Sequence, residues 1–137
     1  MAELQTIVRA SAKGVRQSPR KIGLVAGLVR GRSVADALTI LEFTPKRAAK
    51  PVTKLIAAAK ANAVNNHGLV ESTLQITQLQ VTAGPRLKRF NPAAMGRALP
   101  YQKKSSHILV EVSGEIKPKK VSEKPAAKPA AAKKETK

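Results

Sequence analysis

Residues 72–110 read STLQITQLQVTAGPRLKRFNPAAMGRALPYQKKSSHILV, and the architecture of the chain follows from them. It contains no acidic residue, and its two strand-like ends flank a centre rich in Arg and Lys. A structureless loop of this length is uncommon in a compact domain, whereas two long strands joined by a turn require no such loop. We therefore predict an extended β-hairpin over about residues 79–106, with its turn near Asn91-Pro92.

The predicted hairpin is too long to remain within the rest of the chain. The distance from Leu79 to the turn corresponds to about 40 Å of extended strand, whereas a compact body of about 90 residues has a radius of gyration of only about 12 Å. The large apolar residues of the hairpin are scattered and form no hydrophobic face. We expect a protruding arm that an external surface stabilises, with its strand pairing interrupted at Gly84-Pro85, Pro92, Gly96 and Pro100.

Three helices are predicted before the hairpin. Ser18-Pro19 starts the first, Ser33 with Asp36 caps the second, and Thr44-Pro45 opens the longest. The first helix should end at Gly31 and the longest near residues 65–68. Apolar spacing predicts that the core-facing residues are Ile22, Val25, Ala26 and Val29, then Ala37, Leu38 and Leu41, and then Ala48, Val52, Leu55, Ile56, Ala59 and Ala63.

Three residues fit these helices poorly. A glycine inside a helix costs about 1 kcal/mol relative to Ala, so Gly23 and Gly27 are expected to allow another segment to approach closely. Pro51 lacks a backbone N–H, so we expect a bend there or a looser start to the longest helix.

Strands are predicted at Leu4 to Ala12, Leu74 to Thr82 and His107 to Ser113. The apolar phase shifts between Ile76 and Leu79, which indicates a bulge or burial on both faces. We predict an α+β fold in which three helices pack on one side of a three-stranded antiparallel sheet. Residues 1–116 form this domain, and the Lys/Ala/Pro-rich residues 117–137 are expected to be a disordered tail.

The chain carries 26 Lys and Arg residues against eight Asp and Glu residues, a formal net charge of +18. The tail accounts for eight Lys and two Glu, so +12 remains on residues 1–116. A surplus of this size favours a polyanionic partner, with nucleic acid first and an anionic membrane second. Neither an export signal nor a membrane-spanning run is recognisable, so we expect a soluble intracellular chain.

The sequence shows no pattern typical of an enzyme. The absence of Cys excludes disulfides, thiol nucleophiles and Cys zinc sites. His67 and His107 stand alone, and the carboxylates of residues 1–116 are dispersed. We expect no catalysis, cofactor, metal ion or small-molecule substrate.

The candidate RNA-binding residues form two groups. One surrounds the start of the first helix, and the other follows the hairpin, where Phe90 and Tyr101 either stack on unpaired bases or pack on each other. The candidates are Arg9, Lys13, Arg16, Arg20, Lys21, Arg86, Lys88, Arg89, Phe90, Arg97, Tyr101, Lys103 and Lys104.

Several ordered motifs resemble the uL22 family of bacterial large-subunit ribosomal proteins over about residues 4–113. The motifs are Ser18-Pro19-Arg20-Lys21, Leu28-Val29-Arg30-Gly31, Ala59-Lys60-Ala61-Asn62-Ala63, Asn65-Asn66, Gly84-Pro85, Lys88-Arg89, Gly96-Arg97-Ala98 and Ser106-His107-Ile108. The resemblance implies a structural constituent of the cytoplasmic large subunit that binds 23S ribosomal RNA and supports subunit assembly and translation. Neighbouring large-subunit proteins would be partners.

The same resemblance implies that the hairpin threads between RNA segments and that its tip helps to line the polypeptide exit tunnel, near the nascent polypeptide. Carried over by position, Lys88, Arg89 and Arg97 would contact RNA near the tunnel, and Arg20, Lys21 and Lys60 would contact RNA from the body. The chain departs from the family pattern at the tip. Ala93 and Met95 stand where the family has basic residues.

Two other classes of function compete with this interpretation. The lysine-rich tail is similar to those of DNA-compacting proteins, so a nucleoid-associated DNA-binding protein is the alternative. An anionic-membrane binder is less well supported because no helix has a strong aromatic or Leu-rich face.

Overall fold

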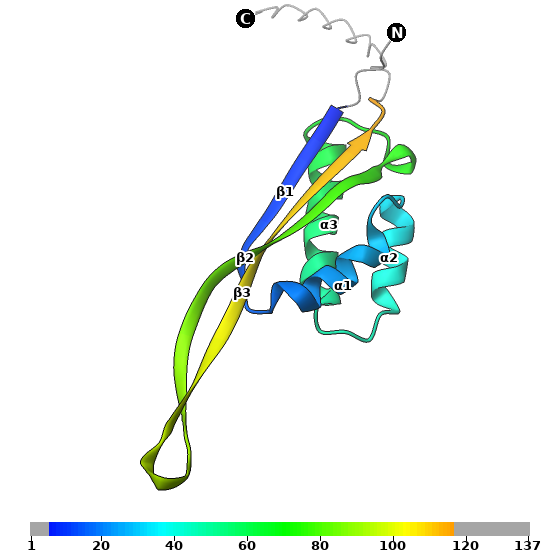
Figure 1. Ribbon diagram of the computed structural model, residues 1–137. Helices are drawn as coiled ribbons and strands as arrows, with labels where there is room; N and C mark the ends of the chain where they lie inside the picture. Colours follow the sequence, from blue (N-terminus) through cyan, green and yellow to red (C-terminus); the bar gives the residue numbers. More distant parts are fainter. Residues whose placement is uncertain (1–5, 117–137) are drawn as a thin grey trace, which may run out of the picture.

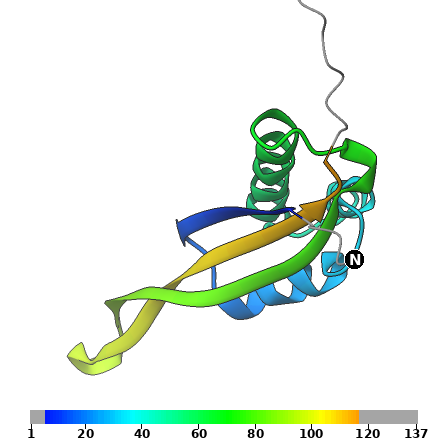
Figure 2. The same ribbon diagram turned by 90° about the horizontal axis from the view of Figure 1, so that it is seen from above.

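β3 (Ala98–Gly114) is the central strand of a three-stranded antiparallel sheet, with β1 (Thr6–Val15) on one side and β2 (Gln75–Pro92) on the other. The computed structural model describes residues 6–116, so the predicted tail lies outside the described residues. The helices α1 (Pro19–Val29), α2 (Val34–Glu42) and α3 (Ala49–Asn65) lie together on one side of the sheet (Figures 1 and 2). The predicted α+β architecture is confirmed.

The core lies between this sheet face and the helices. Every helix position predicted to face inward is buried, apart from Leu38, which is partly buried. The alternation predicted for the last strand is also confirmed, because Ile108, Val110 and Val112 are buried. The sheet contributes Val8, Ile76 and Leu79 to the same cluster. Among residues 6–116, 22 buried apolar residues form one continuous core that holds the body independently of the arm.

The predicted helix boundaries hold for α1 and α2. Ser18 is the N-cap of α1 and Pro19 its first residue, while Gly31 lies just after its end with a φ of 68°. At α2, the Ser33 hydroxyl accepts a hydrogen bond from the Asp36 N–H (3.1 Å) and donates one to the Asp36 carboxylate (2.7 Å). Ser33 therefore caps the helix as predicted, but the Asp36 carboxylate accepts from the Ser33 hydroxyl rather than from the Ser33 backbone N–H of a complete capping box.

The predicted start of α3 at Thr44-Pro45 is wrong. Residues 44–48 form a loop, and the helix begins at Ala49. Pro51 is then the third helical residue, where a backbone N–H would have no partner within the helix. The late start therefore removes the conflict that Pro51 would create in the second turn.

β1 begins at Thr6 and extends to Val15, beyond the predicted end at Ala12. Its pairing with β3 shifts between Ala12 and Val15, where Gly14 has a φ of 71°. The Gly14 N–H donates to His107 Nδ1 (3.0 Å), so this histidine fixes the irregular end of the strand.

β2 and β3 continue beyond β1 as a two-stranded arm that projects away from the helices (Figure 1). Their pairing shifts between Ile76 and Gln78, which confirms the predicted bulge, and again between Ala83 and Arg86. From Arg86↔Lys104 to Pro92↔Ala98 the register is unbroken.

The expected interruptions at Pro92 and Pro100 are wrong, since both residues are paired within the ladder. Each strand of a two-stranded ribbon is an edge, so a proline is tolerated where its N–H would point outward. The interruption at Gly84-Pro85 is confirmed by the second register shift.

Close packing at the base of the arm leaves no room for a side chain at Gly84. A Cβ added there would lie 2.7 Å from Ser105 Oγ and 3.2 Å from the backbone N of Ser106. The Ser105 hydroxyl is itself held by a hydrogen bond to the Pro85 carbonyl (2.6 Å). The close approach predicted at Gly23 and Gly27 is wrong, because a Cβ at either position would meet nothing within 4 Å.

Gly84→Ala and Gly23→Ala should therefore change stability in opposite directions. We expect Gly84→Ala to lower the free energy of unfolding by about 1–3 kcal/mol because backbone atoms must move. Gly23→Ala should raise it by about 0.5–1 kcal/mol because the unfolded chain loses freedom and the helix gains a better helix former. Urea unfolding followed by circular dichroism measures both, with Gly27→Ala as a second open helical position. An unchanged or increased stability of Gly84→Ala would contradict this account of the arm base.

Candidate nucleic-acid interface

The arm has two faces that the unbroken register defines. Residues paired directly across an antiparallel ladder share a face, and successive residues alternate. We call one the inner face, which comprises Leu87, Arg89, Leu99, Tyr101 and Lys103. The opposite one is the outer face, which comprises Arg86, Lys88, Phe90, Gln102 and Lys104. Each face therefore carries basic side chains and one aromatic ring.

The register decides between the two roles considered for Phe90 and Tyr101. Phe90 is paired with Pro100 and Tyr101 with Arg89, so the two rings lie on opposite faces of the ribbon. They cannot pack on each other across it. Phe90 is 67% exposed and Tyr101 37% exposed, so each ring can meet a separate external surface.

The inner face is more apolar than the sequence spacing suggested. It brings together Leu87, Leu99 and Tyr101, of which the two leucines are more than half exposed. Arg89 and Lys103 lie among these residues, so the inner face is mixed apolar and basic rather than a continuous hydrophobic face.

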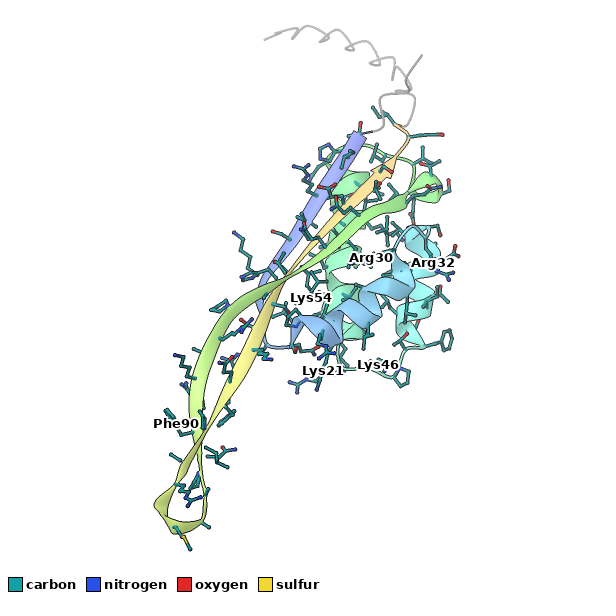
Figure 3. The ribbon with its side chains drawn as sticks, viewed as in Figure 1. Lys21, Arg30, Arg32, Lys46, Lys54 and Phe90 are labelled. Carbon is teal, nitrogen blue, oxygen red and sulfur yellow. The ribbon has the colours of Figure 1, made fainter. Side chains whose placement is uncertain are left out.

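A groove of about 1160 Å³ lies where the arm leaves the body, and we call it the arm-base groove. Its walls come from the end of β1, α1, the loop before α3 and both strands of the arm. Figure 3 shows Lys21 and Lys46 at the end of the helices nearest the arm. The basic residues that line the arm-base groove are Arg16, Lys21, Lys46, Arg47, Arg89, Lys103 and Lys104.

No carboxylate lines the arm-base groove. Among residues 6–116, none of its basic side chains forms an ion pair with Asp or Glu. Seven cations around one hollow repel one another, and the repulsion is relieved when an anion enters. The groove is therefore suited to bind a polyanion.

The candidate cluster before and within the first helix is divided by the fold. Arg16 and Lys21 reach the arm-base groove, and Arg20 is exposed at the start of α1. Arg9 and Lys13 lie instead on the open face of the sheet, because alternation along β1 directs Val8 and Ala10 toward the helices.

Two of the predicted RNA-binding residues are already paired with carboxylates. Arg9 Nε lies 2.7 Å from Glu111 Oε1, and Lys60 Nζ lies 2.5 Å from Glu71 Oε1. An RNA phosphate would compete with these partners, so both residues are weaker candidates than the basic residues of the groove.

The remaining candidates follow the arm. Arg89, Lys103 and Lys104 line the groove. Arg86 and Lys88, which share the outer face with Lys104, do not line it. Arg97 lies at the turn, where its carbonyl accepts a hydrogen bond from the Ala93 N–H (2.8 Å).

Sequence reasoning missed four basic residues of the body. Lys46 and Arg47 line the groove and also a second hollow of about 560 Å³ beside α2 and α3, to which Lys50 and Lys54 contribute. Residues 43–70 contain no Asp or Glu, which is the signal that identified the arm. The same signal would have identified these four residues.

Neither a metal centre nor a membrane span is visible in the described part of the chain. Residues 6–116 contain no group of three or more His, Asp or Glu side chains that could hold a metal ion. None of the helices there is long and apolar enough to cross a membrane.

A small α+β body carrying a projecting, carboxylate-free basic arm defines the class of basic proteins built into nucleoprotein particles. Residues 10–113 match the family model described as Ribosomal protein L22p/L17e. A "Large ribosomal subunit protein uL22" of Pediococcus pentosaceus is 50% identical over 113 residues, covering 82% of this chain and 96% of the relative. The uL22 protein of Clostridioides difficile is 50% identical over 104 residues, covering 76% and 94%.

The chain belongs to the ribosomal protein L22p/L17e family. This is a family of structural ribosomal proteins rather than of enzymes.

In the free protein, backbone amides of the arm should exchange faster than those of the three-stranded part of the sheet. Residues 86–92 and 98–104 are exposed and belong to a two-stranded ribbon, which is marginally stable in water. Residues 108–112 are paired on both sides and alternate residues are buried, so their exchange should be slow. Hydrogen exchange followed by NMR without RNA is the measurement. Strong protection throughout the arm would show that it does not depend on an external surface.

Proposed function

We propose that this chain is a structural protein of the cytoplasmic large ribosomal subunit that binds 23S ribosomal RNA, with the arm inserted between RNA segments. The observation that carries the proposal is the distribution of charge on the arm. Both faces present basic residues, and no acidic residue occurs from Ser72 to Val110. A protein that lay flat on one RNA surface would need only one such face.

Lys and Arg side chains of the arm bind phosphates, which releases condensed counterions and makes the affinity depend on salt. Phe90 on the outer face and Tyr101 on the inner face are placed to stack on unpaired bases of two different RNA segments. The hydrophobic core of the body holds the parts of β2 and β3 from which the arm projects, so the arm enters the RNA in a defined direction.

The tip of the arm has its own chemistry. Met95 is 93% exposed and has a φ of 59°, and Gly96 follows with a φ of 69°. Arg97 is the one basic residue between Asn91 and Leu99. We propose that this turn helps to line the polypeptide exit tunnel, where Met95 faces the nascent polypeptide and Arg97 binds RNA. The family membership supports this placement.

The body also contributes to the assembled subunit. Arg20 and Lys21 bind RNA beside the root of the arm, whereas the open sheet face with Arg9 and Lys13 is available to RNA or to neighbouring ribosomal proteins. Because one chain then joins several RNA segments, its binding favours assembly of the subunit.

The experiment that tests the ribosomal assignment is sedimentation of a cell extract at low magnesium concentration. We expect the chain to remain with large-subunit particles. Co-sedimentation with DNA would contradict the proposal and favour the nucleoid-associated alternative. Flotation with anionic liposomes at physiological salt would indicate a membrane binder instead.

Replacing Lys88 and Arg89 together with Ala should weaken binding to purified 23S RNA and flatten its salt dependence. The slope of log K against log salt concentration should decrease by up to about 2, because each phosphate contact contributes roughly one unit. Filter binding at several salt concentrations measures the slope.

A matched control removes the same charge from residues that already have carboxylate partners. Arg9→Ala combined with Lys60→Ala should change the slope less, because Glu111 and Glu71 partly neutralise these cations in the free protein. Equal slopes for the wild-type and Lys88/Arg89 variant proteins would mean that these two arm residues do not contact phosphate.

A further inference from the structure

The arm-base groove combines two kinds of surface that one simple anion does not explain. Seven basic residues surround it, yet Leu24 from α1 and Leu87 from the arm also line it. Leu24 is 70% exposed and Leu87 54% exposed, so both present apolar surface within the groove. Pro85 and Ala48 add further apolar surface to the same walls.

The cations of the groove come from positions that are distant in sequence. Arg16 and Lys21 flank the start of α1, Lys46 and Arg47 lie in the loop before α3, and Lys103 lies on the returning strand of the arm. None of them has an Asp or Glu partner within residues 6–116. The convergence of these segments makes a concave site rather than a solvated charged face of a single helix.

We propose that the arm-base groove binds an unpaired, extruded nucleotide segment of the ribosomal RNA, with a base against Leu24 and Leu87 and the flanking phosphates on the surrounding cations. This inference rests on the proposed function. Duplex RNA presents phosphates and hydroxyls while its base faces are covered by stacking, so it leaves the two leucines exposed. An unpaired nucleotide offers an apolar base face beside a phosphate, which matches both surfaces of the groove.

The size of the groove agrees with this occupant. Its volume of about 1160 Å³ exceeds the roughly 300–1,000 Å³ of sites that enclose a drug-sized molecule. The space therefore accommodates a nucleotide with its neighbouring phosphates, whereas one free phosphate ion would leave most of it empty.

The α1 helix supplies a matched pair of positions for a test. Leu24 and Leu28 are one helical turn apart and both are exposed, but only Leu24 lines the groove. Truncating either residue to Ala removes no charge and leaves the buried α1 residues unchanged. Leu24→Ala should weaken binding of the full chain to a single-stranded ten-nucleotide uridine RNA by about fivefold. Leu28→Ala should leave this affinity within about twofold of wild type, and neither variant should change binding to a ten-base-pair RNA duplex.

Fluorescence anisotropy with the labelled RNAs measures these affinities. Equal effects of Leu24→Ala and Leu28→Ala, or an equal loss of duplex binding, would overturn the proposed site. If Lys88/Arg89 replacement still weakens 23S RNA binding in that case, the proposed function stands and only the groove assignment fails.

A second measurement locates the contact in the assembled particle. A photoreactive benzoylphenylalanine in place of Leu24, in chains incorporated into large subunits, should crosslink to RNA at an unpaired nucleotide. The same group in place of Leu28 should not crosslink to that nucleotide. Crosslinking from position 24 only to protein, only to base-paired RNA, or to nothing would overturn the inference, and a protein crosslink would identify an acidic protein segment as the occupant.

Discussion

The antiparallel pairing of β2 with β3 is the constraint on which the rest of the structure depends. Near Ile108 and Val110 this ladder lines one side of the hydrophobic core. From Ser106 toward the tip of the arm, the same ladder continues without β1 and without covering helices. One pair of strands therefore belongs both to a stably packed body and to an exposed arm. The bulge at Gly84 and Pro85 separates the two parts, and the close approach of Ser105 there defines how the arm leaves the body.

Charge explains why such an arm persists as part of a working protein. A ribbon with exposed leucines and unpaired cations gains little from folding in water. Under the proposed function, its partner is RNA, which would supply anions and stackable bases on both sides. The body has the complementary role, since its continuous apolar core needs no partner and holds the arm's base in register. Stability is thus concentrated in the body, and the proposed recognition in the arm and its base.

Local sequence signals predict the buried faces of the helices well and the helix ends less well. Apolar spacing identified the buried faces of α1, α2 and α3 because burial on a helix follows a fixed angular period. The start of α3 was mistaken because Pro45 and Pro51 both satisfy the rules for a first turn, and sequence rules alone do not decide between them. Gly23 and Gly27 were also misinterpreted, because a glycine in sequence does not reveal whether its surroundings are crowded or open.

A basic α+β chain with a long acid-free hairpin is predictable from the sequence, because charge, strand alternation and helical period are all local properties. Which residues act together depends on the folded arrangement of the chain. The register places Phe90 and Tyr101 on opposite faces, and a slip of one residue would have placed both rings on the same face. Arg16, Lys46 and Lys103 meet in one groove because α1, the loop before α3 and the arm pack around one corner of the sheet. Proximity between distant segments is a consequence of packing, and no local pattern encodes it.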